Sequence, residues 1–331
     1  MADGVIAAPS AAEPVTRRLR ALARRPEIGI LIVILALIIY MSLRFERFLS
    51  IDNLMNIARN YSDIGIGAVG ITLVLLIGGI DLSVASVMAL GGLVASIAMV
   101  WWGLPIPVAI LLGIGAGVVI GLINGFLIQR LRLAPFIATL GMLGVARGIV
   151  VGTTGGQGVS GLPAEFTAIG QGYIGVVPIP VIVMVIVAIA VALFLAYHVW
   201  GTYIFSIGGN ETAAILTGLP VARVKIFVYV VCSALSALAG VLVVSRVGVS
   251  LPGQSLGYEL QVIAAAVIGG VSLQGGRGTI LGAILGAMLI GLIQNILVFE
   301  RVAPYWQTAF TGGIILLAAI VDIVRQRRSQ T

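Results

Sequence analysis

The sequence predicts an all-α protein that crosses a membrane several times, and three observations support this fold class. Of the 331 residues, 60% are hydrophobic and 9% are charged, whereas a soluble domain carries about a quarter charged residues. The mean hydropathy is +1.17. Apolar runs repeatedly reach about 18 to 20 residues, the length that a helix needs to cross about 30 Å of hydrocarbon. We therefore expect a polytopic membrane protein with about ten transmembrane helices.

Ten apolar segments are expected to cross the membrane, and they divide the chain into one transmembrane domain, residues 28–324, and two polar tails. The segments cover residues 28–43, 61–79, 82–102, 106–128, 135–151, 178–199, 226–247, 258–273, 279–299 and 305–323. The tails are residues 1–27 and 325–331. The first tail is too long and too polar to be the short charged start of a cleaved signal peptide.

The basic residues predict that both tails lie in the cytoplasm. With ten spans and the N-terminal tail inside, 13 of the 19 basic residues fall on the cytoplasmic side, as the positive-inside rule requires. These are Arg17, Arg18, Arg20, Arg24, Arg25, Arg130, Arg132, Arg223, Lys225, Arg277, Arg325, Arg327 and Arg328. Arg44, Arg47 and Arg59 are exceptions in the first outer connection, where we expect an interfacial helix capped by Asp52.

Glycine recurs every fourth residue in two of the predicted segments. One ladder is Gly113, Gly117, Gly121 and Gly125, and the other is Gly278, Gly282 and Gly286. This spacing places the glycines on one helix face and lets helix backbones approach closely in lipid. The ladders predict a tightly packed helix bundle and say nothing about a substrate.

An acidic residue, Asp81, lies inside the apolar stretch "LIGGIDLS" at residues 76–83. Gly78 and Gly79 permit the chain to leave one helix, and the side chains of Asp81 and Ser83 are suited to bond the amides that begin the next. We therefore expect a helix break between Gly78 and Ser83. Asp81 is then either a helix cap or a direct contact with a permeant molecule.

A similar stretch, "VIGGVSLQ" at residues 267–274, predicts a second broken helix between Gly269 and Gly278. Two similar halves are a common plan of transporters. The spacing of the matched pieces differs between the halves, so the sequence leaves open whether the repeat is inverted.

Two connections are long enough to meet partner proteins. On the cytoplasmic side, residues 200–225 contain a short helix that Asn210 is expected to cap and Gly218 to end. On the outer side, residues 152–177 are rich in glycine, with a short helix expected near 163–168. Together with residues 248–259 they are either a landing surface for an extracytoplasmic protein or plain connections.

Several functions are excluded by the composition. The chain has one cysteine, Cys232, and one histidine, His198, so we expect no metal site, internal disulfide or thiol chemistry. An intramembrane enzyme would need a nucleophile and a base, and the single His198, at a membrane edge beside Trp200, is more typical of an interfacial residue than of a catalyst. The net charge of +7 reflects membrane topology, because the basic residues lie beside the spans, and we expect no nucleic-acid partner.

From about residue 48 to 322 the chain resembles the membrane permease subunits of bacterial ATP-binding cassette sugar importers of the ribose, xylose and galactose class. The stretches that carry the resemblance are "GGIDLSVAS", "GLINGFLIQRLRLAPFIATLGMLGVARGI", "IGGNETAAILTGLPVARVK" and "GYELQVIAAAVIGGVSLQGGRGTILGAILGAMLIGLIQN". Together these stretches are highly specific for the family. Two positions depart from its usual pattern: Ala85 stands where a glycine is common, and Gln261 stands where an acid is common.

The resemblance implies a multi-pass protein of the bacterial inner membrane that works as a homodimer. Its implied partners are a cytoplasmic ATPase subunit and a periplasmic or lipid-anchored sugar-binding protein. ATP and magnesium would bind the ATPase, and this chain would hold no cofactor. In agreement, the sequence contains no G-x-x-x-x-G-K-[ST] loop, so we expect it not to be an enzyme.

The resemblance also assigns roles to individual residues. "GGNETAAILTG" is similar to the family's coupling helix, which docks in a groove of the ATPase. Coupling roles are therefore implied for Asn210, Glu211, Ala213, Ala214 and Gly218.

A pathway for an uncharged sugar needs hydroxyl, amide or carboxylate groups between helices. The candidates are Asp81, Ser83, Asn124, Thr139 and Asn295, with Gln294 as a further one. Each of these side chains either contacts the sugar or bonds a neighbouring helix. The alternatives are an importer of a nucleoside or autoinducer sugar, or a secondary transporter, although no carboxylate or histidine relay suggests ion coupling.

Overall fold

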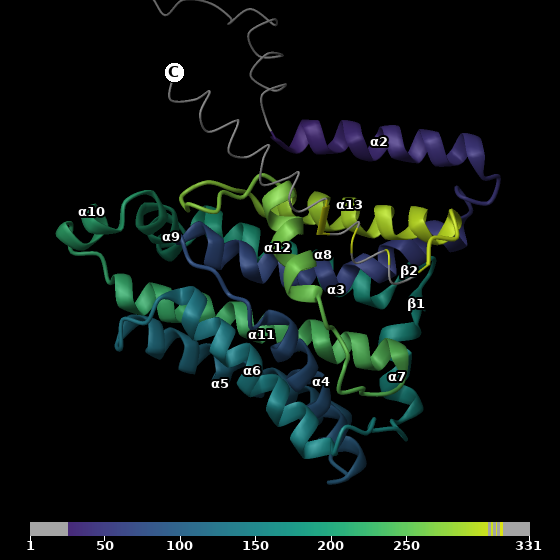
Figure 1. Ribbon diagram of the computed structural model, residues 1–331, viewed down its shortest axis with the longest axis horizontal. Helices are drawn as coiled ribbons and strands as arrows, with labels where there is room; N and C mark the ends of the chain where they lie inside the picture. The colour runs from purple at the N-terminus through teal and green to yellow at the C-terminus, as the bar shows by residue number, and fades with distance from the viewer. Residues whose placement is uncertain (1–25, 304–305, 307–308, 310–311, 314–331) are drawn as a thin grey trace, which may run out of the picture.

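A computed structural model describes residues 26–303, 306, 309 and 312–313 of the chain. Almost all of its regular structure is helical, which confirms the predicted fold class (Figure 1). The helices are α2 (Pro26–Arg44), α3 (Ile51–Leu76), α4 (Val84–Val100), α5 (Ile106–Gln129), α6 (Pro135–Thr154), α7 (Ala164–Gln171), α8 (Ile179–Tyr197), α9 (Val199–Gly209), α10 (Glu211–Leu216), α11 (Val221–Val247), α12 (Tyr258–Ile268) and α13 (Ile280–Phe299). Strands β1 (Tyr173–Ile174) and β2 (Val177–Pro178) form one small antiparallel hairpin.

Six of these helices are long and apolar enough to cross a membrane: α2, α5, α6, α8, α11 and α13. Two further apolar helices, α4 and α12, are shorter than 18 residues. α3 has 26 residues, and its first half is polar. Each of the first nine predicted segments therefore contains a helix. The tenth, residues 305–323, lies almost wholly outside the described residues, as do most of the first tail and all of the second.

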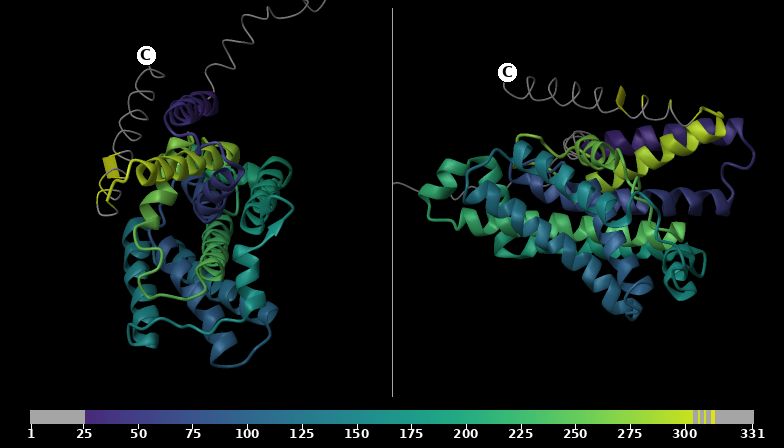
Figure 2. Two further views of the ribbon diagram at one scale, coloured as in Figure 1. Left: turned by 90° about the vertical axis from the view of Figure 1, so that its right-hand side faces the viewer. Right: turned by 60° about the horizontal axis from the view of Figure 1, so that its bottom comes forward.

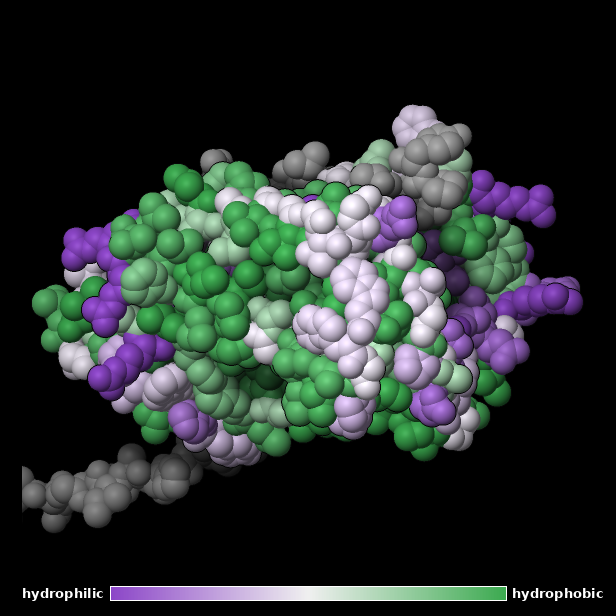
Figure 3. Space-filling model, turned by 90° about the horizontal axis from the view of Figure 1, so that it is seen from below, coloured by the Kyte–Doolittle hydropathy of each residue, from purple (hydrophilic) through white to green (hydrophobic). Residues whose placement is uncertain are grey.

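The helices run roughly alongside one another, with α11 near the centre (Figure 2). α11 packs against α3, α4 and α5, and α3 packs against α12 and α13. α10 lies at one end of the bundle, while α7 and the β-hairpin lie at the other (Figure 1). Hydrophilic residues gather toward the two ends of the face formed by α4, α5 and α6, with mostly apolar residues between them (Figure 3). This arrangement suits a bundle that spans a membrane.

Two expectations about helix boundaries are wrong. The predicted interfacial helix is the first part of α3, because no glycine or proline interrupts residues 51–64. Its N-cap is Ser50, whose hydroxyl oxygen accepts a hydrogen bond from the amide of Asn53 at 3.3 Å, and Asp52 lies inside the first turn. The connection predicted at residues 200–225 is itself largely helical at its start, because helix α9 continues the chain after a bend at His198.

Both glycine ladders lie at close helix contacts, although Gly278 precedes α13 and only Gly282 and Gly286 of the second ladder lie on that helix. A methyl group added at Gly117 would lie 2.5 Å from the carbonyl oxygen of Ser233, and one at Gly121 would lie 2.6 Å from that of Tyr229. α5 and α11 therefore touch backbone to backbone. The second ladder brings α13 equally close to α12, since a methyl group at Gly286 would overlap the carbonyl oxygen of Ala265.

Replacing Gly117 by alanine should separate α5 from α11. We expect the free energy of unfolding in detergent to fall by about 1 to 3 kcal/mol, because the added methyl group meets backbone that cannot rotate away. Gly115→Ala is the matched control on the same helix, since no other atom lies within 4 Å of its added methyl group. Thermal unfolding of both variants checks the prediction, and equal stabilities would contradict it.

Candidate functional site

The first helix break forms as predicted between α3 and α4. Gly78 adopts a positive φ of 73°, a conformation that side chains disfavour. The amide of Gly79 donates to the carbonyl oxygen of Val74 at 2.9 Å. A methyl group at Gly79 would lie 2.6 Å from the hydroxyl oxygen of Tyr229 on α11. Both glycines are therefore needed, one for its backbone conformation and the other for space.

A fully buried hydrogen-bonded cluster occupies this break. Oδ1 of Asp81 accepts hydrogen bonds from the amide of Ser83 at 2.8 Å and from its hydroxyl at 2.6 Å. The side-chain amide of Asn124, on α5, donates to the Ser83 hydroxyl oxygen at 3.0 Å. Asp81, Ser83 and Asn124 are each completely buried. Residues 41 positions apart in the sequence thus meet at the start of α4.

The predicted capping role is correct for Asp81 and wrong for Ser83. Asp81 holds the amide of Ser83, which precedes the first turn of α4. The hydroxyl of Ser83 makes no hydrogen bond to the amides of α4, because it is already used between Asp81 and Asn124. Ser83 therefore links the break to α5.

Thr139 lies beside the same break. Its hydroxyl donates to the carbonyl oxygen of Pro135, one turn earlier on α6, at 2.8 Å. It also lies 3.4 Å from the carbonyl oxygen of Ile80. Four of the five predicted pathway residues are thus brought together: Asp81 and Ser83 from the break, and one residue each from α5 and α6. Their role in a transport pathway stays a prediction.

Some buried polar atoms in and beside this cluster have no hydrogen-bond partner. Among the described residues, Oδ2 of Asp81, Oδ1 of Asn124 and the hydroxyl of Tyr229 are buried and have no hydrogen-bond partner. Asp81 therefore caps the helix with one oxygen and retains the other. Tyr229 was not among the predicted pathway residues, because its only signal in the sequence is a phenol inside an apolar segment.

Asn295 does not belong to this cluster. Its side-chain amide donates to Oδ1 of Asn53 at 3.1 Å and ties α13 to the first turn of α3. Gln294 likewise donates to Oε1 of Gln261 at 3.0 Å and ties α13 to α12. Both residues therefore bond neighbouring helices, which was the second of the two interpretations.

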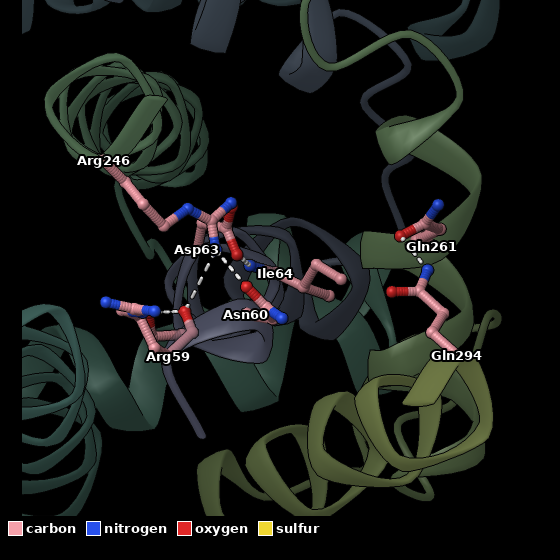
Figure 4. Close-up of polar contacts among 8 residues, drawn as sticks. Arg59, Asn60, Asp63, Ile64, Arg246, Gln261 and Gln294 are labelled. Atoms are coloured by element: carbon pink, nitrogen blue, oxygen red, sulfur yellow. Dashed lines mark hydrogen bonds and ion pairs between the residues drawn. The ribbon is translucent and has the colours of Figure 1, made fainter. Parts of the chain in front are cut away.

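An ion pair that was not predicted from the sequence joins α11 to α3 (Figure 4). Nη2 of Arg246, on α11, lies 2.9 Å from Oδ2 of Asp63, on α3. Nη1 of Arg246 also donates to the side-chain oxygen of Asn60 at 2.9 Å. Asp63 is almost fully buried, and an acid in an apolar helix needs such a partner. The position of Asp63 inside the predicted segment 61–79 was the feature of the sequence that could have indicated this ion pair.

The second helix break, between α12 and α13, also forms where it was predicted. Gly270, Gly275 and Gly276 have positive φ values. The hydroxyl oxygen of Thr279 caps α13 by accepting a hydrogen bond from the amide of Gly282 at 3.0 Å. The amide of Gly276 donates to the carbonyl oxygen of Leu76 at 2.9 Å, so the two breaks are bonded to each other.

The short helix predicted within residues 200–225 is α10. Oδ1 of Asn210 accepts a hydrogen bond from the amide of Ala213 at 2.9 Å, which confirms the expected cap. Gly218 follows with a positive φ of 80°. Ala214 is buried, and Glu211 pairs with Lys225 at 2.6 Å. These contacts fix the inner face of α10 on the bundle.

The other face of α10 is open. The side chains of Ile215 and Leu216 are 58% and 82% exposed at the end of the bundle. A groove of about 1100 Å³ lies beside α10 and reaches Gly78 at the first break. Its basic lining residues are Arg130, Arg132, Arg223 and Lys225. An exposed apolar helix edge next to a basic groove is a surface suited to a protein partner.

Comparisons with known proteins give one consistent result. Residues 53–319 match the family model described as the permease component of the branched-chain amino acid transport system. The ribose import permease of Haemophilus influenzae is 40% identical over 295 residues, which cover 88% of this chain and 91% of the relative. The L-arabinose ABC transporter permease of Azospirillum brasilense is 37% identical over 303 residues, with 91% and 89% covered. The xylose transport permease of H. influenzae is 32% identical over 342 residues, with 85% and 91% covered. No solved structure matches.

Substitutions at Asp81 should separate its cap from its charge. Asp81→Ala removes the acceptor of a buried amide and a buried hydroxyl, so we expect the free energy of unfolding to fall by about 1 to 3 kcal/mol. Asp81→Asn keeps one acceptor oxygen and should lose less than half of that amount. Thermal unfolding of both variants in detergent measures the difference. Equal losses would mean that the charge, not the cap, stabilises the break.

Proposed function

The chain belongs to the family of transport-system permease components, and from this premise we propose that it is the membrane subunit of an ATP-binding cassette importer that carries a monosaccharide inward. As a permease component it is a non-enzymatic subunit. ATP and magnesium bind the partner ATPase, and ATP hydrolysis there drives alternating access of the pathway. This family membership argues against a secondary transporter.

The sugar assignment rests on one observation. The chain is 32 to 40% identical, over 85% or more of its length, to permeases named for ribose, arabinose and xylose. The cluster at the first break fits this class of substrate. The buried polar atoms of Asp81, Asn124 and Tyr229 include carbonyl and carboxylate acceptors and a phenol, which suit sugar hydroxyls. A nucleoside or an autoinducer sugar remains the second candidate, since both carry a pentose-like group.

Docking of the ATPase is assigned to α10 and the groove beside it. Asn210, Glu211, Ala213, Ala214 and Gly218 shape and fix this helix. Leu216 supplies the exposed apolar anchor. Four basic side chains line the neighbouring groove and favour an acidic surface on the ATPase.

The outer end of the bundle is assigned to the sugar-binding protein. α7 and the β-hairpin lie there, and the isolated bridge between Val159 and Ser250 joins the two outer connections. Nη1 of Arg147 donates to the carbonyl oxygens of Pro252 and Gln254 at 2.8 and 3.0 Å. These bonds make one ordered surface from two loops. In this orientation the protein lies in the bacterial inner membrane with both termini in the cytoplasm.

The homodimer is assigned to the outward face of α6. Gly141, Gly144, Gly148 and Gly152 lie along this helix, and no other atom comes within 4 Å of a methyl group added at any of them. The ladder glycines of α5, in contrast, are packed against α4 and α11. Glycines spaced by three or four residues favour close helix contact in lipid, so a second copy of the chain is the partner that this face suits.

Uptake tests the proposed function. The chain is reconstituted in liposomes with its partner ATPase and binding protein and is supplied with radiolabelled ribose, arabinose, xylose or hexoses. We expect ATP-dependent uptake of one of these sugars.

Leu216→Asp should lower ATPase binding and uptake about tenfold, because it places a charge on the docking anchor. Leu256→Asp, which changes an exposed outer leucine, is the control for ATPase binding. ATP-independent uptake would contradict the proposal.

Crosslinking tests the dimer face. Val145 lies on α6 next to Gly144 and is 54% exposed. In a Cys232→Ala background, Val145→Cys should form a crosslinked dimer with a short bis-maleimide in membranes. Ile186→Cys on α8, which is 60% exposed, is the matched control and should stay monomeric. The reverse pattern would move the dimer interface to α8.

A further inference from the structure

The segment that leads into α10 touches both helix breaks at one backbone position, Gly208. α9 ends with Gly208 and Gly209, and Asn210 then caps α10. A methyl group at Gly208 would overlap the carbonyl oxygen of Leu76 and lie 2.5 Å from the amide nitrogen of Gly276. Leu76 ends α3 at the first break, and Gly276 lies in the second. Three segments far apart in the sequence therefore meet without any intervening side chain.

The contacts among the other members of this junction are equally close. A methyl group at Gly275 would lie 2.9 Å from both the carbonyl oxygen of Gly208 and the amide nitrogen of Gly78. Gly276 donates its amide to the carbonyl oxygen of Leu76 at 2.9 Å. Gly78, Gly275 and Gly276 all have positive φ values. The junction is thus built from main chain whose conformation and spacing both require glycine.

Such a junction has a mechanical consequence. Contacts between side chains can adjust by rotamer changes, whereas contacts between main-chain atoms move only when the segments move. A displacement of α10 by the ATPase must therefore displace the end of α3 and the loop after α12 together. The first of these leads through Gly78 and Gly79 directly to the buried cluster of Asp81, Ser83 and Asn124.

We propose that Gly208 is a positioning residue for transport, which transmits movement of α10 to both helix breaks at once. This inference rests on the proposed function, because it needs an ATPase that moves α10. It differs from ordinary packing in one respect: loss of the contact should change how much sugar is moved for each ATP, and not only how much complex is formed.

Gly208→Ala tests the proposal with Gly209→Ala as its neighbour control. No other atom lies within 4 Å of a methyl group at Gly209, so that variant should behave like the wild type. For Gly208→Ala in the reconstituted complex, we expect the ratio of sugar transported to ATP hydrolysed to fall about tenfold at an equal amount of assembled complex. A wild-type ratio would overturn the proposal, and so would an equal fall in both variants.

Hydrogen exchange in the wild-type complex gives a second test that needs no variant. Binding of a non-hydrolysable ATP analogue should change the exchange of peptides from residues 74–83 and 269–280 together with that of α10. Change confined to α10 would overturn the proposal. If the wild-type complex carries no sugar at all, the proposed function fails instead, so the two failures are distinguishable.

Discussion

In an apolar bundle every buried peptide N–H and C=O group needs a hydrogen-bond partner inside the protein, and the break between Leu76 and Val84 frees several such groups. They are satisfied in three ways. Gly79 bonds back to Val74, Asp81 accepts the amide of Ser83, and the carbonyl oxygen of Leu76 accepts the amide of Gly276 from the second break. Two of these bonds are local and the third comes from the second break, so a distant segment completes the first break and is fixed in place by the same bond.

Glycine makes these long-range bonds geometrically possible. Its lack of a side chain serves three purposes in this chain. The ladder on α5 lets two long helices touch, Gly78 and Gly276 adopt conformations that other residues avoid, and Gly208 admits a third backbone segment to the junction. Where glycines meet no neighbour, as on the outward face of α6, the same property suits a contact with another chain.

The charged groups of the membrane domain follow a related rule. Asp63 is paired with Arg246, and Asp81 is held by hydrogen bonds at a helix start, so each buried acid has a local compensation. The two acids differ in whether a carboxylate oxygen remains without a hydrogen-bond partner. Asp63 uses both oxygens, one for Arg246 and one for the amide of Ile64. Asp81 retains one oxygen beside Asn124 and Tyr229, which makes the first break the more suitable place for a polar permeant.

The sequence by itself determined the features that depend on neighbours along the chain. Apolar runs predicted nine segments in which helices form, glycine spacing predicted the faces of α5 and α13, and Asn210 and Gly218 predicted the limits of α10. Helix periodicity, caps and breaks are local, so a single sequence shows them. Only the tertiary structure decided which of the polar candidates meet, that Asn295 bonds Asn53 instead, and that Gly208 contacts both breaks. Those contacts depend on the rotation and register of packed helices, which no local pattern encodes.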